Sequence, residues 1–79
     1  MSIKDQVIAL IIENLEVDAQ AVVPEAKFIE DLGVSSMDLW ELVLVMEDEF
    51  DLEVPDEDLE KIVTIQDAIS FIESHVEKK

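Results

Sequence analysis

The segment from Ser35 to Phe50 most constrains the fold, because it predicts a helix that is apolar on almost every side. Ser35 and Asp38 have the spacing of a capping box, so Ser36 is the expected first helical residue. One stripe at helical spacing consists of Leu39, Leu42, Val43, Met46 and Phe50. The apolar surface is extended by Met37, Trp40, Leu44 and Val45. A helix of this kind is central in its fold or has a second apolar face for a partner.

A first helix is predicted upstream, from Ser2 to about Leu15. Ser2 and Asp5 form an approximate capping box at its start. Its apolar residues recur at helical spacing: Ile3, Val7, Ile8, Leu10, Ile11, Ile12 and Leu15. The pattern loosens over residues 17–34, which predicts a long connection of a kind that is often functional. The apolar residues of that connection are expected to pack into the core: Val22, Phe28, Ile29 and Leu32.

Two shorter signals organise the C-terminal third of the chain. Pro55 breaks the preceding segment, and Asp56 is expected to cap a short helical turn that contains Leu59 and Ile62. Thr64 and Asp67 form a capping pair for a last helix to about Val76. The inward stripe of that helix consists of Ile65, Ala68, Ile69 and Ile72, with Phe71 beside it.

These patterns predict an all-α fold, a small bundle of three main helices plus one short helix, with a long loop between the first and second helices. No sustained alternation at period two occurs, so strands are not expected. With 79 residues the chain is near the lower size limit for a domain that folds without disulfides or a bound metal. We therefore expect a single domain over residues 1–79.

The charge balance excludes one class of partner and favours another. The chain has 21 acidic residues against five lysines and no arginine, which gives a net charge of −16. Nucleic-acid phosphates would repel such a chain, so no nucleic-acid binding is expected. The charge favours rapid, salt-sensitive docking onto basic surfaces of other proteins, although it also serves simply to keep a small protein soluble.

The chain has no cysteine, so any thiol chemistry must come from outside it. No apolar stretch approaches the roughly 20 residues of a membrane span, and the N-terminus lacks a signal-peptide pattern. The expected location is the cytoplasm. No metal site is expected either, because the acidic run from Asp51 to Glu60 lacks the loop glycine of an EF-hand, and His75 has no second histidine or cysteine.

No enzymatic site is expected, since Ser36 lacks a glycine-flanked elbow and a His–Asp relay. As a first helical residue, Ser36 would project its hydroxyl toward solvent. A phosphate ester at that position would meet free backbone N–H groups and the positive end of the helix dipole. From these residues alone, Ser35 and Ser36 are better explained as capping residues than as an attachment site.

Residue order and spacing along nearly the whole chain add a further indication. FIEDLG precedes the two serines, EDEF ends the second helix, and VPDEDLEKI follows. In this order the chain resembles the acyl carrier protein family, in which an Asp-Ser-Leu motif opens the second helix. The resemblance implies that Ser36 carries 4′-phosphopantetheine, transferred from coenzyme A by a phosphopantetheinyl transferase. Ser35 replaces the usual aspartate and Met37 the usual leucine, which raises the question of which transferase and synthases recognise this chain.

The resemblance also implies roles for other residues. Partner enzymes with basic docking patches, among them acyl-transferring and chain-elongating enzymes, would contact residues on or near the second and third helices. The expected partner-binding residues are Met37, Asp38, Glu41, Leu44, Glu47, Asp48, Val54, Asp56 and Glu60. Family members sequester the acyl chain between the helices. The residues expected to line that acyl-chain pocket are Phe28, Met46, Phe50, Ile62 and Ala68.

The functional expectation is a monomeric, non-enzymatic acyl carrier protein. It would hold acyl intermediates as thioesters on a phosphopantetheine arm at Ser36 and deliver them in fatty acid or related lipid biosynthesis. Two alternatives remain at this point. One is a carrier of polyketide or aminoacyl intermediates, and the other is an unmodified acidic module that binds basic partners through its second helix.

Overall fold

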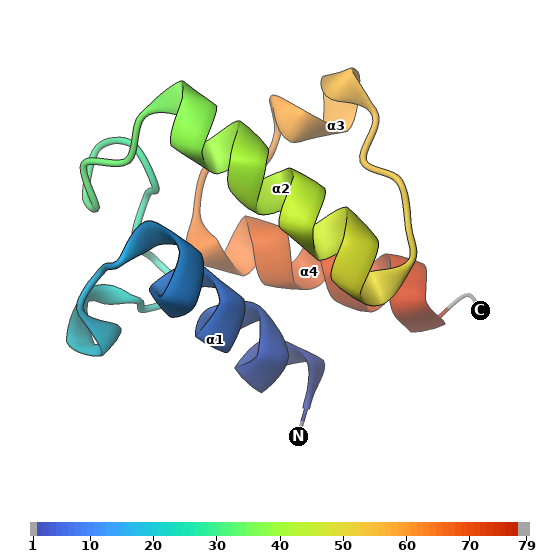
Figure 1. Ribbon diagram of the computed structural model, residues 1–79, viewed down its shortest axis with the longest axis horizontal. Helices are drawn as coiled ribbons and strands as arrows, with labels where there is room; N and C mark the ends of the chain where they lie inside the picture. Colours follow the sequence, from blue (N-terminus) through green and yellow to red (C-terminus); the bar gives the residue numbers. More distant parts are fainter. Residues whose placement is uncertain (1, 78–79) are drawn as a thin grey trace.

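The computed structural model describes residues 2–77, with no side-chain detail for Glu77. These residues form four α-helices and one short 3₁₀ turn (Figure 1). The bounds are Ile3–Leu15 for α1, Ala19–Ala21 for the 3₁₀ turn η1, Ser36–Phe50 for α2, Asp56–Leu59 for α3 and Ile65–Glu77 for α4. α1 packs against both α2 and α4, and in the view of Figure 1 α2 lies between α1 and α3. The predicted all-α bundle is confirmed.

Side-chain caps set where the main helices begin. Ser2 Oγ accepts a hydrogen bond from the Asp5 backbone N–H at 3.2 Å, at the start of α1. Ser35 Oγ accepts one from the Asp38 N–H at 3.1 Å, at the start of α2. Each bond satisfies one of the backbone donors that the first turn of a helix leaves without an intrahelical partner. Both predicted helix starts are therefore confirmed.

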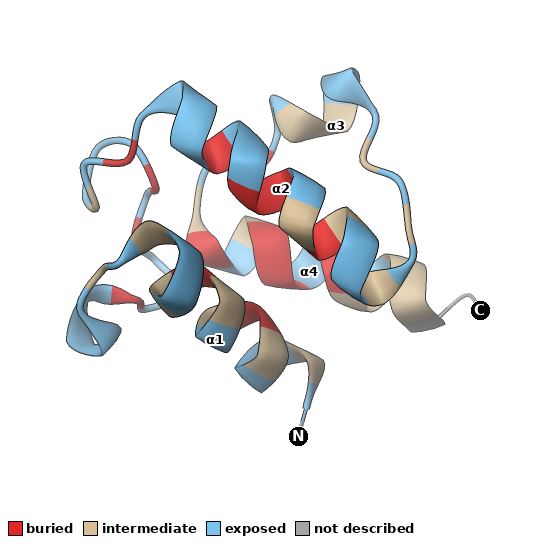
Figure 2. Cartoon of the chain, viewed as in Figure 1, coloured by how far each residue is buried: buried red, intermediate tan, exposed pale blue. Residues whose placement is uncertain are grey.

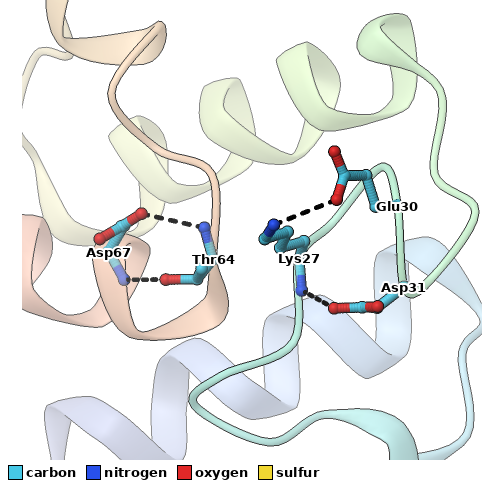
Figure 3. A network of polar contacts seen from close by, with 5 residues as sticks. All are labelled: Lys27, Glu30, Asp31, Thr64 and Asp67. Carbon is cyan, nitrogen blue, oxygen red and sulfur yellow. Dashed lines mark hydrogen bonds and ion pairs between the residues drawn. The ribbon is translucent and has the colours of Figure 1, made fainter.

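The cap of α4 is closed in both directions. Thr64 Oγ1 accepts from the Asp67 N–H at 3.1 Å, and Asp67 Oδ2 accepts from the Thr64 N–H at 3.0 Å (Figure 3). Asp67 Oδ2 also accepts from the Val63 N–H at 3.1 Å. This reciprocal arrangement is a capping box, as the sequence predicted.

The short helix α3 begins differently from the prediction. Asp56 was expected to cap it, but Asp56 is its first helical residue, and Pro55 in an extended conformation occupies the position before it. No side chain caps α3; instead the Pro55 carbonyl accepts from the Asp58 N–H at 2.9 Å and the Leu59 N–H at 3.0 Å. Proline is well accommodated at this position, because its fixed φ suits the residue that leads into a helix. Ile62 lies beyond the end of the helix and is buried.

The core lies where the apolar stripes of α1, α2 and α4 meet (Figure 2). Figure 2 shows the buried positions of the three helices turned toward one another, as their 3.6-residue periodicity requires. The buried helical residues are Val7, Ile11, Leu39, Leu42, Val43, Met46, Ile65, Ala68, Ile69 and Ile72. The predicted stripes of α2 and α4 are confirmed, with Phe50 and Phe71 half-buried at the edge of the core.

The long connection between α1 and α2 is fixed by pairing with the segment before α4. Lys27 and Thr64 form an antiparallel bridge, the only β-pairing among residues 2–77. The Phe28 N–H donates to the Val63 carbonyl at 3.0 Å, and the Ile65 N–H donates to the Ala26 carbonyl at 2.9 Å. In the view of Figure 3 the two segments face each other across this pairing. The connection is thereby anchored to the start of α4.

Most of the apolar residues in the connection pack as predicted, with one exception. Val22 and Phe28 are buried and Leu32 is half-buried, but Ile29 is 53% exposed, so its predicted place in the core was wrong. Directly after the bridge at Lys27 the chain enters a turn over residues 28–32, in which the Asp31 N–H and the Leu32 N–H both donate to the Lys27 carbonyl. Phe28 faces the core at the start of this turn, and Ile29 lies on its exposed side.

Candidate functional site

The two serines at the start of α2 have different environments. Ser35 Oγ is occupied as the helix cap, whereas Ser36 is exposed and its hydroxyl makes no hydrogen bond to any described residue. Gly33, with φ of +69°, turns the chain just before this point, in a conformation that residues with a Cβ rarely adopt. Buried Val34 then fixes the approach to the helix. The fold thus presents the Ser36 hydroxyl to solvent at the first position of a fixed helix.

A hollow of about 350 Å³ adjoins Ser36. The segment 27–30 forms one wall, and Ser36 and Leu39 of α2 form another. The third side is closed by Leu59, Glu60, Ile62 and Val63. Its lining is mixed: Phe28, Ile29 and Val63 supply apolar surface, and the charged side chains are Lys27, Glu30 and Glu60. The exposed serine and the adjoining space fit a covalently attached, elongated group with polar and apolar parts.

A second, interior hollow lies deeper in the bundle and measures only about 10 Å³. It shares three lining residues with the hollow beside Ser36: Phe28, Leu39 and Ile62. Four of the five residues predicted for an acyl-chain pocket line it: Phe28, Met46, Ile62 and Ala68. Phe50 is not part of its lining. The structure therefore brings four of the predicted residues together around a small space that adjoins the larger hollow beside Ser36.

The outward face of α2 combines exposed apolar and acidic side chains. Met37 is 70% exposed, Trp40 49% and Leu44 43%, at spacings of three and four residues that place them on one face of the helix. The predicted acidic residues Asp38, Glu41, Asp48, Asp56 and Glu60 are also exposed. Trp40 was not among the predicted partner-binding residues, although its large apolar surface next to the Met37 and Leu44 positions was visible in the sequence.

Two predicted partner-binding residues are engaged within the protein. Glu47 is half-buried, and its Oε2 accepts a hydrogen bond from the Val54 N–H at 2.8 Å. Val54 is itself half-buried and lines the interior hollow. The bond ties the end of α2 to the loop before α3. No local pattern in the sequence signals this contact, because it joins residues seven positions apart across a helix end.

Asp67 and His75 both make contacts within the protein. The Thr64 backbone N–H is the main cause that lowers the pKa of Asp67, with help from the Val63 N–H and the Thr64 hydroxyl, while partial burial opposes them. His75 stacks on Phe71 with ring centroids 4.0 Å apart, and its Nδ1 lies 2.9 Å from the Phe71 carbonyl oxygen.

Within residues 2–77 no cluster of His, Cys, Asp and Glu is arranged to hold a metal ion. None of the described helices has the length and apolar character needed to cross a membrane.

Comparison with known proteins adds independent evidence. A family model described as a phosphopantetheine attachment site matches residues 5–72, a span that includes both serines and all of α2. The acyl carrier protein of Solidesulfovibrio magneticus is 52% identical to this chain over 73 residues, which cover 92% of this chain and 94% of that protein. Since the matches extend over most of the chain and the exposed serine and its hollow suit the attached group, this chain belongs to the acyl carrier protein family, whose members are carriers, not catalysts, with a covalently bound 4′-phosphopantetheine.

Proposed function

We propose that the 4′-phosphopantetheine of this carrier is attached to Ser36 and that it holds acyl intermediates of fatty acid or related lipid biosynthesis. The observation that supports Ser36 as the attachment point is the difference in hydrogen bonding between the two serine hydroxyls. Ser35 Oγ is held by the Asp38 N–H, whereas the Ser36 hydroxyl is exposed and has no hydrogen-bond partner among the described residues. A transferase can therefore reach Ser36 Oγ without breaking the helix cap.

The chemistry at Ser36 is a transfer onto its hydroxyl. Ser36 Oγ forms a phosphodiester with the phosphopantetheinyl part of coenzyme A, the pyrophosphate linkage breaks, and adenosine 3′,5′-bisphosphate leaves. The serine proton passes to a base of the transferase, since no described side chain of this protein forms a hydrogen bond with Ser36 Oγ. Once attached, the group supplies the terminal thiol that this cysteine-free chain lacks, and acyl groups are held on it as thioesters.

The two hollows suggest where an acyl chain is sheltered. The larger one opens beside Ser36, and the interior one, at about 10 Å³, has room for about one water molecule. An acyl chain can enter the interior only when the shared wall of Phe28, Leu39 and Ile62 moves apart. Met46 is well suited to yield, because its unbranched side chain repacks at low cost. We therefore assign the interior hollow of this resting form as the part of the core that expands around cargo.

The outward face of α2 is the proposed docking surface for partner enzymes, the phosphopantetheinyl transferase among them. Met37, Trp40 and Leu44 supply apolar contact area, and the neighbouring Asp38, Glu41 and Asp48 supply negative charge. Carboxylates at the rim steer the approach of a basic surface, while a few apolar or aromatic side chains provide most of the binding energy. The partner surface that fits is a shallow apolar depression ringed by arginine and lysine.

We further propose that the carrier acts as a cytoplasmic monomer. The net charge of −16 supports the monomeric state, because copies of the chain repel one another. The cytoplasmic location rests on the sequence alone.

Modification of variants tests the attachment point. The apo-protein is incubated with coenzyme A and a broad-specificity phosphopantetheinyl transferase, and its intact mass is measured. Ser35→Asp is the matched control, because aspartate also caps a helix and so preserves the start of α2. We expect one phosphopantetheine to be added to the wild type and to Ser35→Asp, and none to Ser36→Ala. Modification of Ser36→Ala, or of none of the three proteins, would contradict the proposal.

A further inference from the structure

We propose that Lys27 is the counterion of the phosphodiester on Ser36: its ammonium group leaves Glu30 and binds the phosphate when the prosthetic group is attached. This inference rests on the proposed attachment at Ser36. It concerns how the chain's own residues respond to the modification, and it assigns a binding role to a residue outside the predicted site.

Positive charge is scarce in this protein, and Lys27 lines the same hollow as Ser36. The chain has five lysines and no arginine. Among the described residues, Lys27 is the only basic side chain that lines the hollow beside Ser36. Lys61 lies in a different environment, paired with Asp58 at 3.9 Å and lining a separate depression with Asp67 and His75.

The backbone of Lys27 is fixed, while its side chain is free to move. Its backbone pairs with Thr64 in the antiparallel bridge, and its N–H donates to Asp31 Oδ2 at 2.8 Å (Figure 3). The Lys27 carbonyl accepts from the Asp31 N–H at 2.9 Å and the Leu32 N–H at 3.1 Å. These bonds hold the base of the side chain at the edge of the hollow, so that only the flexible methylene stem has to turn for the ammonium group to change partner.

The present partner of Lys27 is weakly held. Lys27 Nζ lies 3.1 Å from Glu30 Oε2, and the two side chains are 46% and 71% exposed. Ion pairs this exposed contribute little to stability, so exchanging one anion for another costs little. Figure 3 shows the ammonium group directed toward Glu30, away from the fixed bonds of the backbone.

The electrostatic surroundings of the phosphate make the exchange favourable. A phosphodiester adds one negative charge to a hollow that already contains the carboxylates of Glu30 and Glu60. Negative groups added beside Asp or Glu destabilise through repulsion unless a cation is available. Lys27 is the cation within this hollow that can offset the repulsion.

The test compares the apo and holo forms of the full chain in three variants. Lys27→Gln removes the proposed counterion. Lys61→Gln is the matched control, because it removes the same charge and a similar i,i+3 ion pair away from the hollow. Lys27→Arg keeps the charge and should behave like the wild type. The holo forms are made with coenzyme A and transferase, and the readouts are the ¹³Cε–¹Hε NMR signals of the lysines and the melting temperature.

We expect the Lys27 signal to shift on conversion to the holo form while the Lys61 signal stays in place. Conversion should lower the melting temperature of Lys27→Gln by about 2 °C or more relative to its effect on Lys61→Gln. That difference should disappear in 1 M NaCl, where the screening length falls to about 3 Å. An unmoved Lys27 signal, together with equal responses of the two glutamine variants, overturns the inference.

The outcomes separate this inference from the attachment proposal on which it rests. If the wild type gains the mass of phosphopantetheine, Ser36→Ala does not, and the Lys27 signal stays unmoved, then the counterion role is contradicted and the attachment at Ser36 is supported. A wild-type chain that takes up no phosphopantetheine, or takes it up elsewhere, removes both.

Discussion

At the scale of single residues, the start of α2 assigns different roles to two identical side chains. Ser35 Oγ bonds the Asp38 N–H at 3.1 Å, while Ser36 is exposed and its hydroxyl has no partner among the described residues. The family's usual aspartate before the modified serine would also cap the helix, because a carboxylate oxygen can accept the same hydrogen bond. Replacement by Ser35 therefore preserves the cap and removes one negative charge beside the proposed attachment site at Ser36.

Stability measurements on serine variants test whether Ser35 alone caps α2. Ser35→Ala should lower the free energy of unfolding by about 1 kcal/mol, the usual cost of a lost N-cap. Ser36→Ala should leave it within about 0.5 kcal/mol of the wild type, as is usual for an exposed surface position. Urea unfolding of the apo-proteins followed by circular dichroism gives both values. Equal losses for the two variants would show that Ser36 also supports the helix.

At the scale of elements, local features were predictable from the sequence, whereas contacts between the loops and distant segments were not. Capping boxes and apolar stripes are local patterns, so the starts of α1, α2 and α4 and the buried faces of α2 and α4 were predictable. Contacts between distant segments were not, because nothing near Lys27 in the sequence points to Thr64, and nothing near Glu47 points to Val54. Ile29 is exposed because it lies in the turn that follows the bridge at Lys27.

The candidate site divides in the same way. The capping box and the apolar stripe of α2 predict that Ser36, Asp38, Glu41 and Asp48 face solvent, and these residues are exposed. The hollow beside Ser36 is built by three segments far apart in the chain, so its lining, and Lys27 within it, could not be predicted from local spacing. Phe50 illustrates the limit of a stripe: it continues the periodicity of α2 but lies at the end of the helix, beyond the interior hollow.

The bond between Glu47 and Val54 gives a prediction at the element scale. Glu47→Ala should lower the free energy of unfolding by about 1–3 kcal/mol, because the half-buried Val54 N–H loses a charged acceptor. Asp48→Ala removes the same charge from an exposed neighbour and should be neutral or slightly stabilising in a chain of net charge −16. Urea unfolding compares the two. A loss of similar size in both variants would assign the effect to charge rather than to the hydrogen bond.

At the scale of the whole molecule, repulsion among carboxylates opposes folding. Against the net charge of −16, the described residues form two ion pairs, Lys27 with Glu30 and Lys61 with Asp58. Screening by salt weakens the repulsion, so the melting temperature should rise on addition of NaCl or millimolar MgCl₂. Thermal unfolding followed by circular dichroism measures this. A melting temperature that stays constant or falls with added salt would mean that repulsion does not limit the stability of this fold.

Asp67 makes the stability of the fold depend on pH in one range. Its pKa is lowered from an ordinary value of 3.8, chiefly by the Thr64 N–H, so its contribution to stability is complete above that value and is lost as the pH falls through the folded-state pKa. Asp67→Asn should therefore be less stable than the wild type by about 1 kcal/mol at pH 7, since a charged acceptor becomes neutral. The difference should shrink below about pH 4, where the unfolded wild type binds the proton while the folded state still resists it, and the loss is complete once the pH has fallen through the lowered folded-state pKa. Urea unfolding across pH 2–7 measures it, and a difference independent of pH would contradict the assignment.

The central claim, attachment at Ser36, is tested most directly by locating the group within the wild-type chain. Holo-protein is digested, and fragment-ion mass spectrometry of the peptide that spans Gly33 to Asp38 separates the two serines, because a break between Ser35 and Ser36 leaves them on different fragments. We expect phosphopantetheine on the fragments that contain Ser36 and none on those that end at Ser35. Phosphopantetheine on Ser35, or on any residue outside this peptide, would contradict the claim.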